Sequence, residues 1–286
     1  MKNAESSNLK WLDQSTFELT IAIPAKKITK ERQISLEKLT KQVKIKGFRK
    51  GKAPLKMAEE AIEKNKIYED IIQRLLPALY LEQIKKHQLK PITNPKFSLV
   101  SAEEGKDWQV RAVAYQKPKV SLGKYKEKIK KINAKEKIWV PGKEEKKETD
   151  QKKQENKEKR MQKIIQTLIA EVKVELPSGL VEDEVSRKLS QLIDQLSKAS
   201  ISLENHAASL GKNIPQIREE YRQQTINTLK IEFILEAVAD KEKITVDKEE
   251  LEKLAKTNQQ AGQQINQYMV AHFLRQQKTI EYLESL

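Results

Sequence analysis

Apolar and polar positions along residues 1–117 follow the period of a strand, then of helices, then of strands again. Phe17, Leu19, Ile21 and Ile23 alternate with smaller or polar residues, which predicts a half-buried strand that ends at Pro24. Helical spacing follows over 28–45, from Pro54 onward and over 67–84, and strands are expected at 97–100 and 108–115. The order β-α-α-α-β-β predicts an α+β domain over residues 1–117.

From residue 143 the pattern is helical throughout. A nearly all-polar stretch, 143–163, runs directly into apolar positions spaced three and one apart up to Val172, which favours one long helix. Further helices are expected after Pro177, over 202–210 with Gly211 as a cap, over 214–238, from Asp247 through Leu251 and Leu254, and around 265–283. Their narrow apolar stripes and long polar faces predict an all-α domain, 143–286, built of extended arms with accessible apolar grooves.

Residues 118–142 lie between these parts and are rich in lysine. We interpret them as a basic linker with one or two short strand-like pieces, such as Lys137–Val140, since a domain needs about 50 residues. The whole chain of 286 residues has 56 Lys and Arg against 41 Asp and Glu, a net charge of +15. Residues 41–56 and 117–137 each carry +7 of it, which favours an anionic partner such as RNA, a ribosome surface or an acidic protein over two merely solvated faces.

Catalytic and metal-binding patterns are missing from the sequence. It has no cysteine, its three histidines (His87, His206 and His272) are far apart, and it contains neither a phosphate-binding glycine loop nor a G-x-S-x-G elbow. We therefore expect no enzyme activity, no cofactor and no metal. No apolar run reaches the ~18 residues of a membrane span, and Met1–Lys10 lacks the apolar core of a signal peptide. We expect a cytoplasmic protein with no membrane partner.

One short motif combines shape with charge. In Gly47-Phe48-Arg49-Lys50-Gly51-Lys52-Ala53-Pro54, two glycines permit a tight turn around one aromatic residue and three cations. The segment is either a simple turn between helices or a contact loop. As a contact loop, Arg49 would supply bidentate pairing and Phe48 desolvated area toward RNA or an acidic protein.

This motif resembles the G-F-R-x-G-x-x-P signature of trigger factor, the bacterial ribosome-associated chaperone family. Later segments resemble that family's helical arm in the right order: Leu176–Glu182 at its start, Ser202–Glu204 through Leu210–Lys212 at its turn, and Ile244–Asp247 after it. The resemblance covers nearly the whole chain.

The resemblance implies an ATP-independent holdase that docks at the ribosomal exit tunnel and shields nascent chains. Its partners would be an exit-tunnel ribosomal protein with adjacent rRNA, unfolded or nascent polypeptides, and a second copy in a weak homodimer off the ribosome. Ribosome binding would fall to Gly47, Phe48, Arg49, Lys50, Gly51, Lys52 and Pro54. Client binding is expected at the apolar arm positions Val185, Leu189, Leu192, Leu196, Ile226, Leu229 and Phe233.

The sequence departs from the family pattern at two places. The family usually inserts a prolyl-isomerase domain of the FK506-binding type between its two other parts, and the roughly 22 residues from Ser121 to Gly142 cannot hold one. We therefore expect no isomerase activity. Lys46 stands where an acidic residue would be unsurprising, which makes the loop more basic.

Two other hypotheses remain open at the level of sequence. A basic RNA- or ribosome-binding factor without client activity is favoured by the lysines of 117–137. An active prolyl isomerase is disfavoured by length alone.

Overall fold

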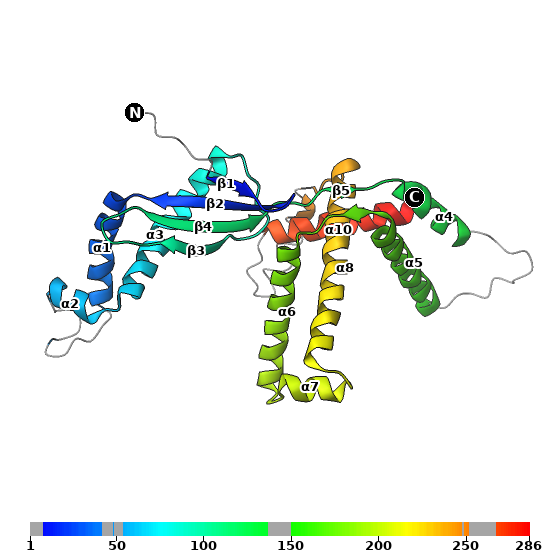
Figure 1. The fold of residues 1–286 in the computed structure, drawn as a ribbon. Helices are drawn as coiled ribbons and strands as arrows, with labels where there is room; N and C mark the ends of the chain where they lie inside the picture. The colour runs from blue at the N-terminus through cyan, green and yellow to red at the C-terminus, as the bar shows by residue number, and fades with distance from the viewer. Residues whose placement is uncertain (1–7, 42–47, 49–53, 137–149, 248, 252–266) are drawn as a thin grey trace, which may run out of the picture. The chain divides into compact units, whose positions relative to one another are not determined.

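The computed structural model describes residues 8–41, 48, 54–136, 150–247, 249–251 and 267–286. The chain divides into two compact units, Met1–Lys117 and Pro118–Leu286, and each has a buried apolar core of its own (Figure 1). The first unit is α+β and the second is mostly helical, as the sequence predicted.

The first unit is built on a four-stranded antiparallel sheet. Its strands are β1 (Leu9–Trp11), β2 (Thr16–Ile23), β3 (Lys96–Ser101) and β4 (Trp108–Tyr115), in the order β1-β2-β4-β3. The central pair is in continuous register from Thr16 opposite Tyr115 to Ile23 opposite Trp108. An irregularity between Leu99 and Ser101 interrupts the pairing of the edge strand β3. The sequence pattern missed only β1, which is too short to show a period.

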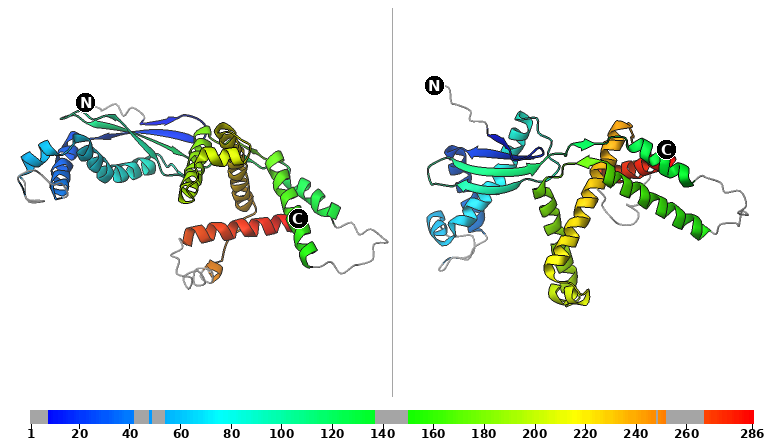
Figure 2. Two further views of the ribbon diagram at one scale, coloured as in Figure 1. Left: turned by 90° about the horizontal axis from the view of Figure 1, so that it is seen from below. Right: turned by 45° about the vertical axis from the view of Figure 1, so that its right-hand side comes forward.

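Helices cover one face of this sheet. The helices are α1 (Ala25–Thr40), α2 (Leu55–Ala61) and α3 (Lys64–Lys86), and α1 and α3 lie against the same face (Figures 1 and 2). Alternate residues of β2 and β4 point toward them, because successive side chains of a strand point to opposite faces. The resulting core is Phe17, Leu19, Ile21, Ile23, Trp108, Val110, Ala112 and Ala114 from the strands with Ile28, Leu36, Ile67, Ile71, Leu76 and Tyr80 from the helices.

The second unit consists of helices and one short strand pair. Its elements are β5 (Val120–Ser121), α4 (Tyr125–Glu136), α5 (Asp150–Glu171), β6 (Lys173–Val174), α6 (Ser178–Lys198), α7 (Leu203–Ser209), α8 (Ile214–Lys241) and α10 (Gln267–Ser285). Helices α6 and α8 run side by side as a hairpin, with α7 across its end (Figures 1 and 2). We call these three helices the arm.

The segment 118–142 is not a plain linker, which corrects the sequence-based interpretation over its described part, 118–136. Strand β5 pairs with β6, Val120 opposite Val174, and α4 buries Tyr125 and Ile129 in the core of the second unit. These two residues and Ile132 stand at i, i+4 and i+7, so they form an amphipathic stripe. The many lysines between these apolar positions favoured the interpretation of the segment as a linker. The expected strand 137–140 lies outside the described residues, as do 143–149 and Leu254.

Several helix ends share one backbone motif. After α6, Ser200 adopts a left-handed conformation with φ 57°, its N–H bonds to the carbonyl of Ser197, and the N–H of Ile201 bonds to that of Leu196. This is a Schellman motif, in which glycine usually takes the left-handed position. Gly211, with φ 67°, takes that position after α7, where the sequence predicted a cap.

A carboxylate joins three elements of the second unit. Glu242, the residue that caps the end of α8, accepts hydrogen bonds from the Tyr125 hydroxyl at 2.9 Å, the Lys126 ammonium at 2.7 Å and the Tyr282 hydroxyl at 2.8 Å. The hydrogen bond from Lys126 lowers the pKa of Glu242 most, burial opposes it, and the two tyrosines lower it further, to about 2. The carboxylate therefore stays ionised while it holds α4, α8 and α10 together.

We expect Glu242→Gln to lower the free energy of unfolding of the second unit by on the order of 2 kcal/mol at pH 7, because hydrogen bonds to a charged acceptor are lost. The folded-state pKa lies below the ordinary value of 4.5. The stabilisation is therefore complete above about pH 4.5 and disappears as the pH falls toward about 2. Urea unfolding at pH 7 and pH 3 measures both effects. Glu158→Gln, at an exposed position of α5, is the control. An equal loss in both variants at pH 7 would contradict the assignment.

We expect Ser200→Gly to raise the free energy of unfolding by about 0.5–1 kcal/mol, since glycine removes the steric cost of the left-handed conformation. Gly211→Ala should lower it by a similar amount, for the same reason in reverse. Thermal unfolding of the two variants beside the unchanged chain measures the difference. Shifts of the same sign in both variants would show that backbone conformation does not control these ends.

Candidate functional site

The motif loop connects α1 to α2 in the first unit. Among its predicted contact residues, Gly47, Arg49, Lys50, Gly51 and Lys52 lie outside the described residues. Phe48 is described and is half-buried, and Pro54 is exposed directly before α2 begins at Leu55.

Ion pairs hold together the helices that flank this loop. The Arg32 guanidinium of α1 pairs with Glu59 of α2 at 2.6 Å and also with Glu104 in the turn between β3 and β4. Arg32 thus links α1 to α2 and to the turn between β3 and β4. The helices on either side of the loop are therefore joined to each other by an ion pair.

A buried carboxylate fixes the second half of α1. Asp70 of α3 accepts hydrogen bonds from the Ser35 hydroxyl at 2.7 Å and from the Lys38 ammonium. Burial alone would raise the pKa of Asp70, but the hydrogen bonds from Lys38 and Ser35 hold it below its ordinary value. Asp70 is thus an ionised anchor between α3 and the second half of α1, the helix that precedes the loop.

The predicted client-binding residues form the seam of the arm. Val185 is fully buried and Phe233 is 6% exposed, so neither offers surface in this structure. The other five are half-buried: Leu189, Leu192, Leu196, Ile226 and Leu229. Ion pairs across the seam, from Arg218 at 2.7 Å and Arg222 at 3.2 Å to Glu182, add to its packing. Most of the apolar area of these seven residues therefore serves to join α6 to α8.

Exposed apolar side chains gather instead on α10. Tyr268, Met269 and Phe273 are 77%, 67% and 64% exposed. Met269, Phe273 and Ile280 stand at i, i+4 and i+11, so they share one face of the helix. We call this face the α10 stripe.

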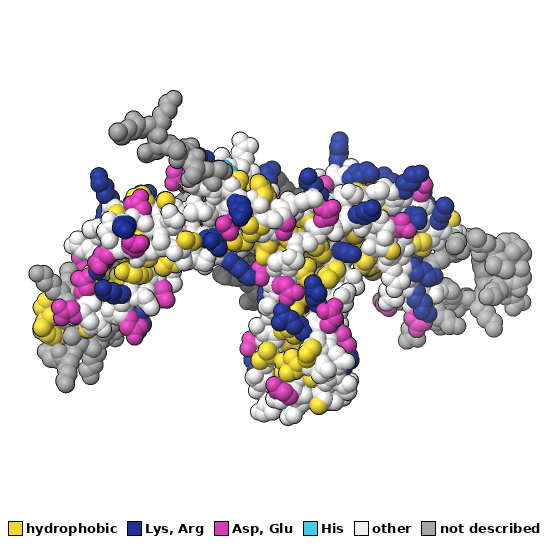
Figure 3. Space-filling view, in the orientation of Figure 1, with side chains coloured by type: hydrophobic (Ala, Val, Ile, Leu, Met, Phe, Trp, Pro, Cys, Tyr) yellow, Lys and Arg dark blue, Asp and Glu magenta, His cyan; other side chains and the backbone are white. Residues whose placement is uncertain are grey.

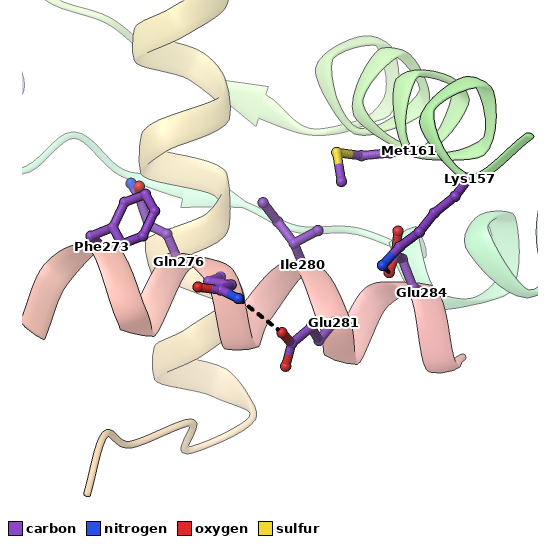
Figure 4. Close-up of a pocket in the computed structure, with 8 residues that line it drawn as sticks. Lys157, Met161, Phe273, Gln276, Ile280, Glu281 and Glu284 are labelled. Carbon is purple, nitrogen blue, oxygen red and sulfur yellow. Dashed lines mark hydrogen bonds and ion pairs between the residues drawn. The ribbon is translucent and has the colours of Figure 1, made fainter. Parts of the chain in front are cut away.

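The C-terminal part of the α10 stripe lines a pocket. The pocket has a volume of about 260 Å³, and α10 and α5 form its two walls (Figure 4). Phe273 and Ile280 line it from α10, and Met161 and Lys157 line it from α5. Its other lining residues are Gln276, Gln277, Glu281 and Glu284. The apolar surface therefore continues from an open helix face into a half-enclosed groove with a polar rim.

The sequence pattern placed these residues on the last helix but did not mark them as surface. Met269 and Phe273 lie on one side of α10, but the buried residues Val270, Thr279 and Leu283 do not form a single opposite face, because Val270 and Thr279 are nine residues, or half a turn, apart. The spacing of its apolar residues therefore does not show which side of α10 the fold covers.

The described residues include no group of three or more His, Asp or Glu side chains placed to hold a metal ion. All three histidines are described and half-buried. None of the helices in the described part of the chain combines the length and apolarity that crossing a membrane requires.

Two family models match this chain, one over each part of it. The family model described as "Bacterial trigger factor protein (TF)" matches residues 5–151, and the one described as "Bacterial trigger factor protein (TF) C-terminus" matches residues 143–286. The two matches overlap over residues 143–151. They leave no interval between them for an inserted domain.

Among curated relatives, trigger factors from Staphylococcus aureus strains JH9, Newman and JH1 are each 38% identical over 108 residues, which is 38% of this chain. The match spans 25% of the length of these relatives. A solved structure of the trigger factor chaperone, described for its promiscuous substrate recognition in folding and assembly, superimposes with a TM-score of 0.63. The superposition covers 97% of this chain and 99% of that chain at 14% identity, so it shows the fold alone.

The two family matches, the fold and the G-F-R-x-G-x-x-P motif between α1 and α2 agree, and the chain belongs to the trigger factor family.

Proposed function

We propose that this protein is an ATP-independent holdase that binds unfolded polypeptides through apolar surface of its second unit and docks at the ribosomal exit tunnel through the loop 47–54. The α10 stripe carries the first half of this proposal. Met269 and Phe273 of the stripe, and Tyr268 beside them, are more than half exposed, and the stripe continues through Phe273 and Ile280 into a pocket. Family membership and the motif support the second half.

The chemistry of the α10 stripe suits many client sequences. Methionine is unbranched and polarisable, so Met161 and Met269 can adapt to differently shaped side chains. Phe273 and Tyr268 supply aromatic area, while Gln276 and Gln277 offer both donors and acceptors to the backbone of an extended chain. Full burial of one such side chain is worth about 1.5–3 kcal/mol, so a few contacts give weak, reversible binding.

The arm contributes a secondary surface in this proposal. Ile201, Leu210 and Ile214 are exposed where α7 joins the two long helices. The half-buried seam residues Leu189, Leu192, Leu196, Ile226 and Leu229 offer less area, and Val185 and Phe233 would contact a client only if α6 and α8 separated. We therefore place the principal client contact on α10 rather than along the seam.

The proposed ribosome contact is the loop itself, with Phe48, Arg49 and Lys50 as the contacting side chains. Arginine and lysine would pair with rRNA phosphates or acidic side chains, and the half-buried Phe48 would add apolar area. We propose a cytoplasmic protein without isomerase activity, since the matches to the two family models overlap and leave no interval between them for that domain. A weak homodimer off the ribosome remains part of the proposal.

We expect the triple variant Phe48→Ala, Arg49→Ala, Lys50→Ala to lose at least tenfold in ribosome affinity, because it removes both the charged and the apolar contacts of the loop. Co-sedimentation with ribosomes measures it at low and high salt. Binding by the unchanged chain should weaken as salt rises. Lys26→Ala, Lys27→Ala, Lys30→Ala, at exposed positions of α1, is the control. Unchanged co-sedimentation of the loop variant would refute the docking assignment.

We expect the double variant Met269→Gln, Phe273→Gln to protect a denatured protein less well from aggregation after dilution from guanidinium. The concentration of the variant that halves aggregation should be about five times that of the unchanged chain. That factor corresponds to about 1 kcal/mol of lost apolar contact. Light scattering without ribosomes measures it. Leu81→Gln, at an exposed apolar position of the first unit, is the control. Equal protection by the double variant and the unchanged chain would exclude α10 as the client surface.

A further inference from the structure

A group of lysines lies at the start and on the outward side of α4, in the second unit. Lys124, directly before the helix, and Lys128, Lys130 and Lys131 within it are all exposed, and we call these four residues the α4 basic face. Basic side chains gather over the part of the second unit that contains β5 and α4 (Figure 3). Lys119 and Lys173, also exposed, stand beside and within the adjoining strand pair. The motif loop belongs to the other unit, so this surface is separate from the proposed ribosome contact.

Packing fixes the direction in which this face points. Tyr125, Ile129 and Asn133 occupy the opposite side of α4 and are buried. The Asn133 side-chain amide donates to the backbone carbonyls of Leu283 at 3.1 Å and Glu284 at 3.3 Å. Together with the Glu242 cluster these contacts prevent α4 from rotating, so the lysines are held toward solvent on a rigid element.

Most of this charge has no ion-pair partner among the described residues. Lys128 pairs with Glu171 at 2.7 Å, and no such pair is formed by Lys124, Lys130 or Lys131 in the part of the chain that the structure describes. Glu127 is the one acidic residue among the exposed positions of α4 from 124 to 131.

On the arm the same kinds of residue are paired. Arg187 bonds to Glu184, Lys212 to Glu220, and Arg218 to Glu182. The arm therefore has a mixed surface, whereas α4 presents a surface of one sign.

The spacing of the lysines makes their fields add. The rise of 1.5 Å per residue places Lys124 and Lys131 about 10 Å apart along the helix axis. That distance is close to the Debye length at physiological salt, so an anion near the face interacts with all four lysines at once. A run of phosphates fits such a surface better than a single carboxylate does.

The type of side chain distinguishes RNA from an acidic protein. Protein interfaces depend on buried aromatic or arginine anchors, and the exposed positions 124, 127, 128, 130, 131 and 134 of α4 are four lysines, one glutamate and one alanine. Lysine is a point charge suited to phosphate. We propose that the α4 basic face binds the phosphate backbone of RNA without sequence preference. This second anionic contact acts independently of the loop 47–54.

The test is the binding of a fluorescein-labelled 20-nucleotide single-stranded RNA to the full chain, followed by anisotropy from 25 to 200 mM salt. The variant is Lys124→Gln, Lys130→Gln, Lys131→Gln, which leaves the Lys128–Glu171 pair intact and keeps good helix formers. We expect its affinity at 25 mM salt to fall about tenfold. The slope of log K against log salt should fall by about 2, because each phosphate contact to a single strand contributes roughly 0.7.

The matched control is Lys188→Gln, Lys198→Gln, Lys230→Gln, which changes the net charge equally on the arm helices and should bind as the unchanged chain does. Circular dichroism and thermal unfolding verify that all variants fold. The proposal fails if the unchanged chain does not bind the RNA, if the α4 variant binds normally, or if the control loses as much. It also fails if polyglutamate of equal charge displaces the RNA as well as unlabelled RNA does.

The triple-alanine loop variant separates this inference from the proposed function. It should lose ribosome co-sedimentation while its affinity for the RNA oligonucleotide falls less than twofold. Loss of oligonucleotide binding in the loop variant alone would assign RNA contact to the loop and overturn the α4 assignment. If the α4 variant binds the RNA normally while the loop variant loses ribosome binding, the α4 assignment is wrong and the proposed function stands.

Discussion

The second unit depends on one ionised carboxylate. Glu242 lies at the end of α8 and receives three hydrogen bonds, two from α4 and one from α10. A partly buried charge is stabilised when its hydrogen-bonding capacity is met, and here three donors meet it. The cluster joins segments more than 100 residues apart in sequence. With the apolar core beside it, the cluster holds α4, α8 and α10 together.

The chain has few apolar residues with which to cover its apolar surfaces. Only 37% of its residues are apolar, and many of them pack on one face of the sheet or in the core around Tyr125 and Leu168. The far side of α10 receives no covering element among the described residues. An exposed patch of this kind usually marks an interaction surface. Met269 and Phe273 are the most exposed part of this face apart from Tyr268.

Charge is arranged differently on different elements. Along the arm, arginines and glutamates pair across and within helices, so the arm surface attracts neither sign strongly. In the first unit, Arg32 and Asp70 are used internally to hold α1, α2 and α3 around the loop. On the α4 basic face only Lys128 has an ion-pair partner among the described residues, Glu171. The exposed apolar face of α10 and the α4 basic face are therefore two different surfaces of the second unit.

Local patterns in the sequence predicted most element types, the division near residue 117 and the motif loop, because these depend on local period, turn residues and a contiguous motif. They missed β1 and α4. Phe17 to Ile23 alternate whatever packs on them, and Gly211 favours a cap in any context. Only the tertiary structure decided which apolar faces are covered. Val185 of α6 and Phe233 of α8 are buried, whereas Met269 and Phe273 stay open because nothing described covers them. Tyr125 and Ile129 belong to a core because partners distant in sequence bury them, and burial is a property of the partner as much as of the residue.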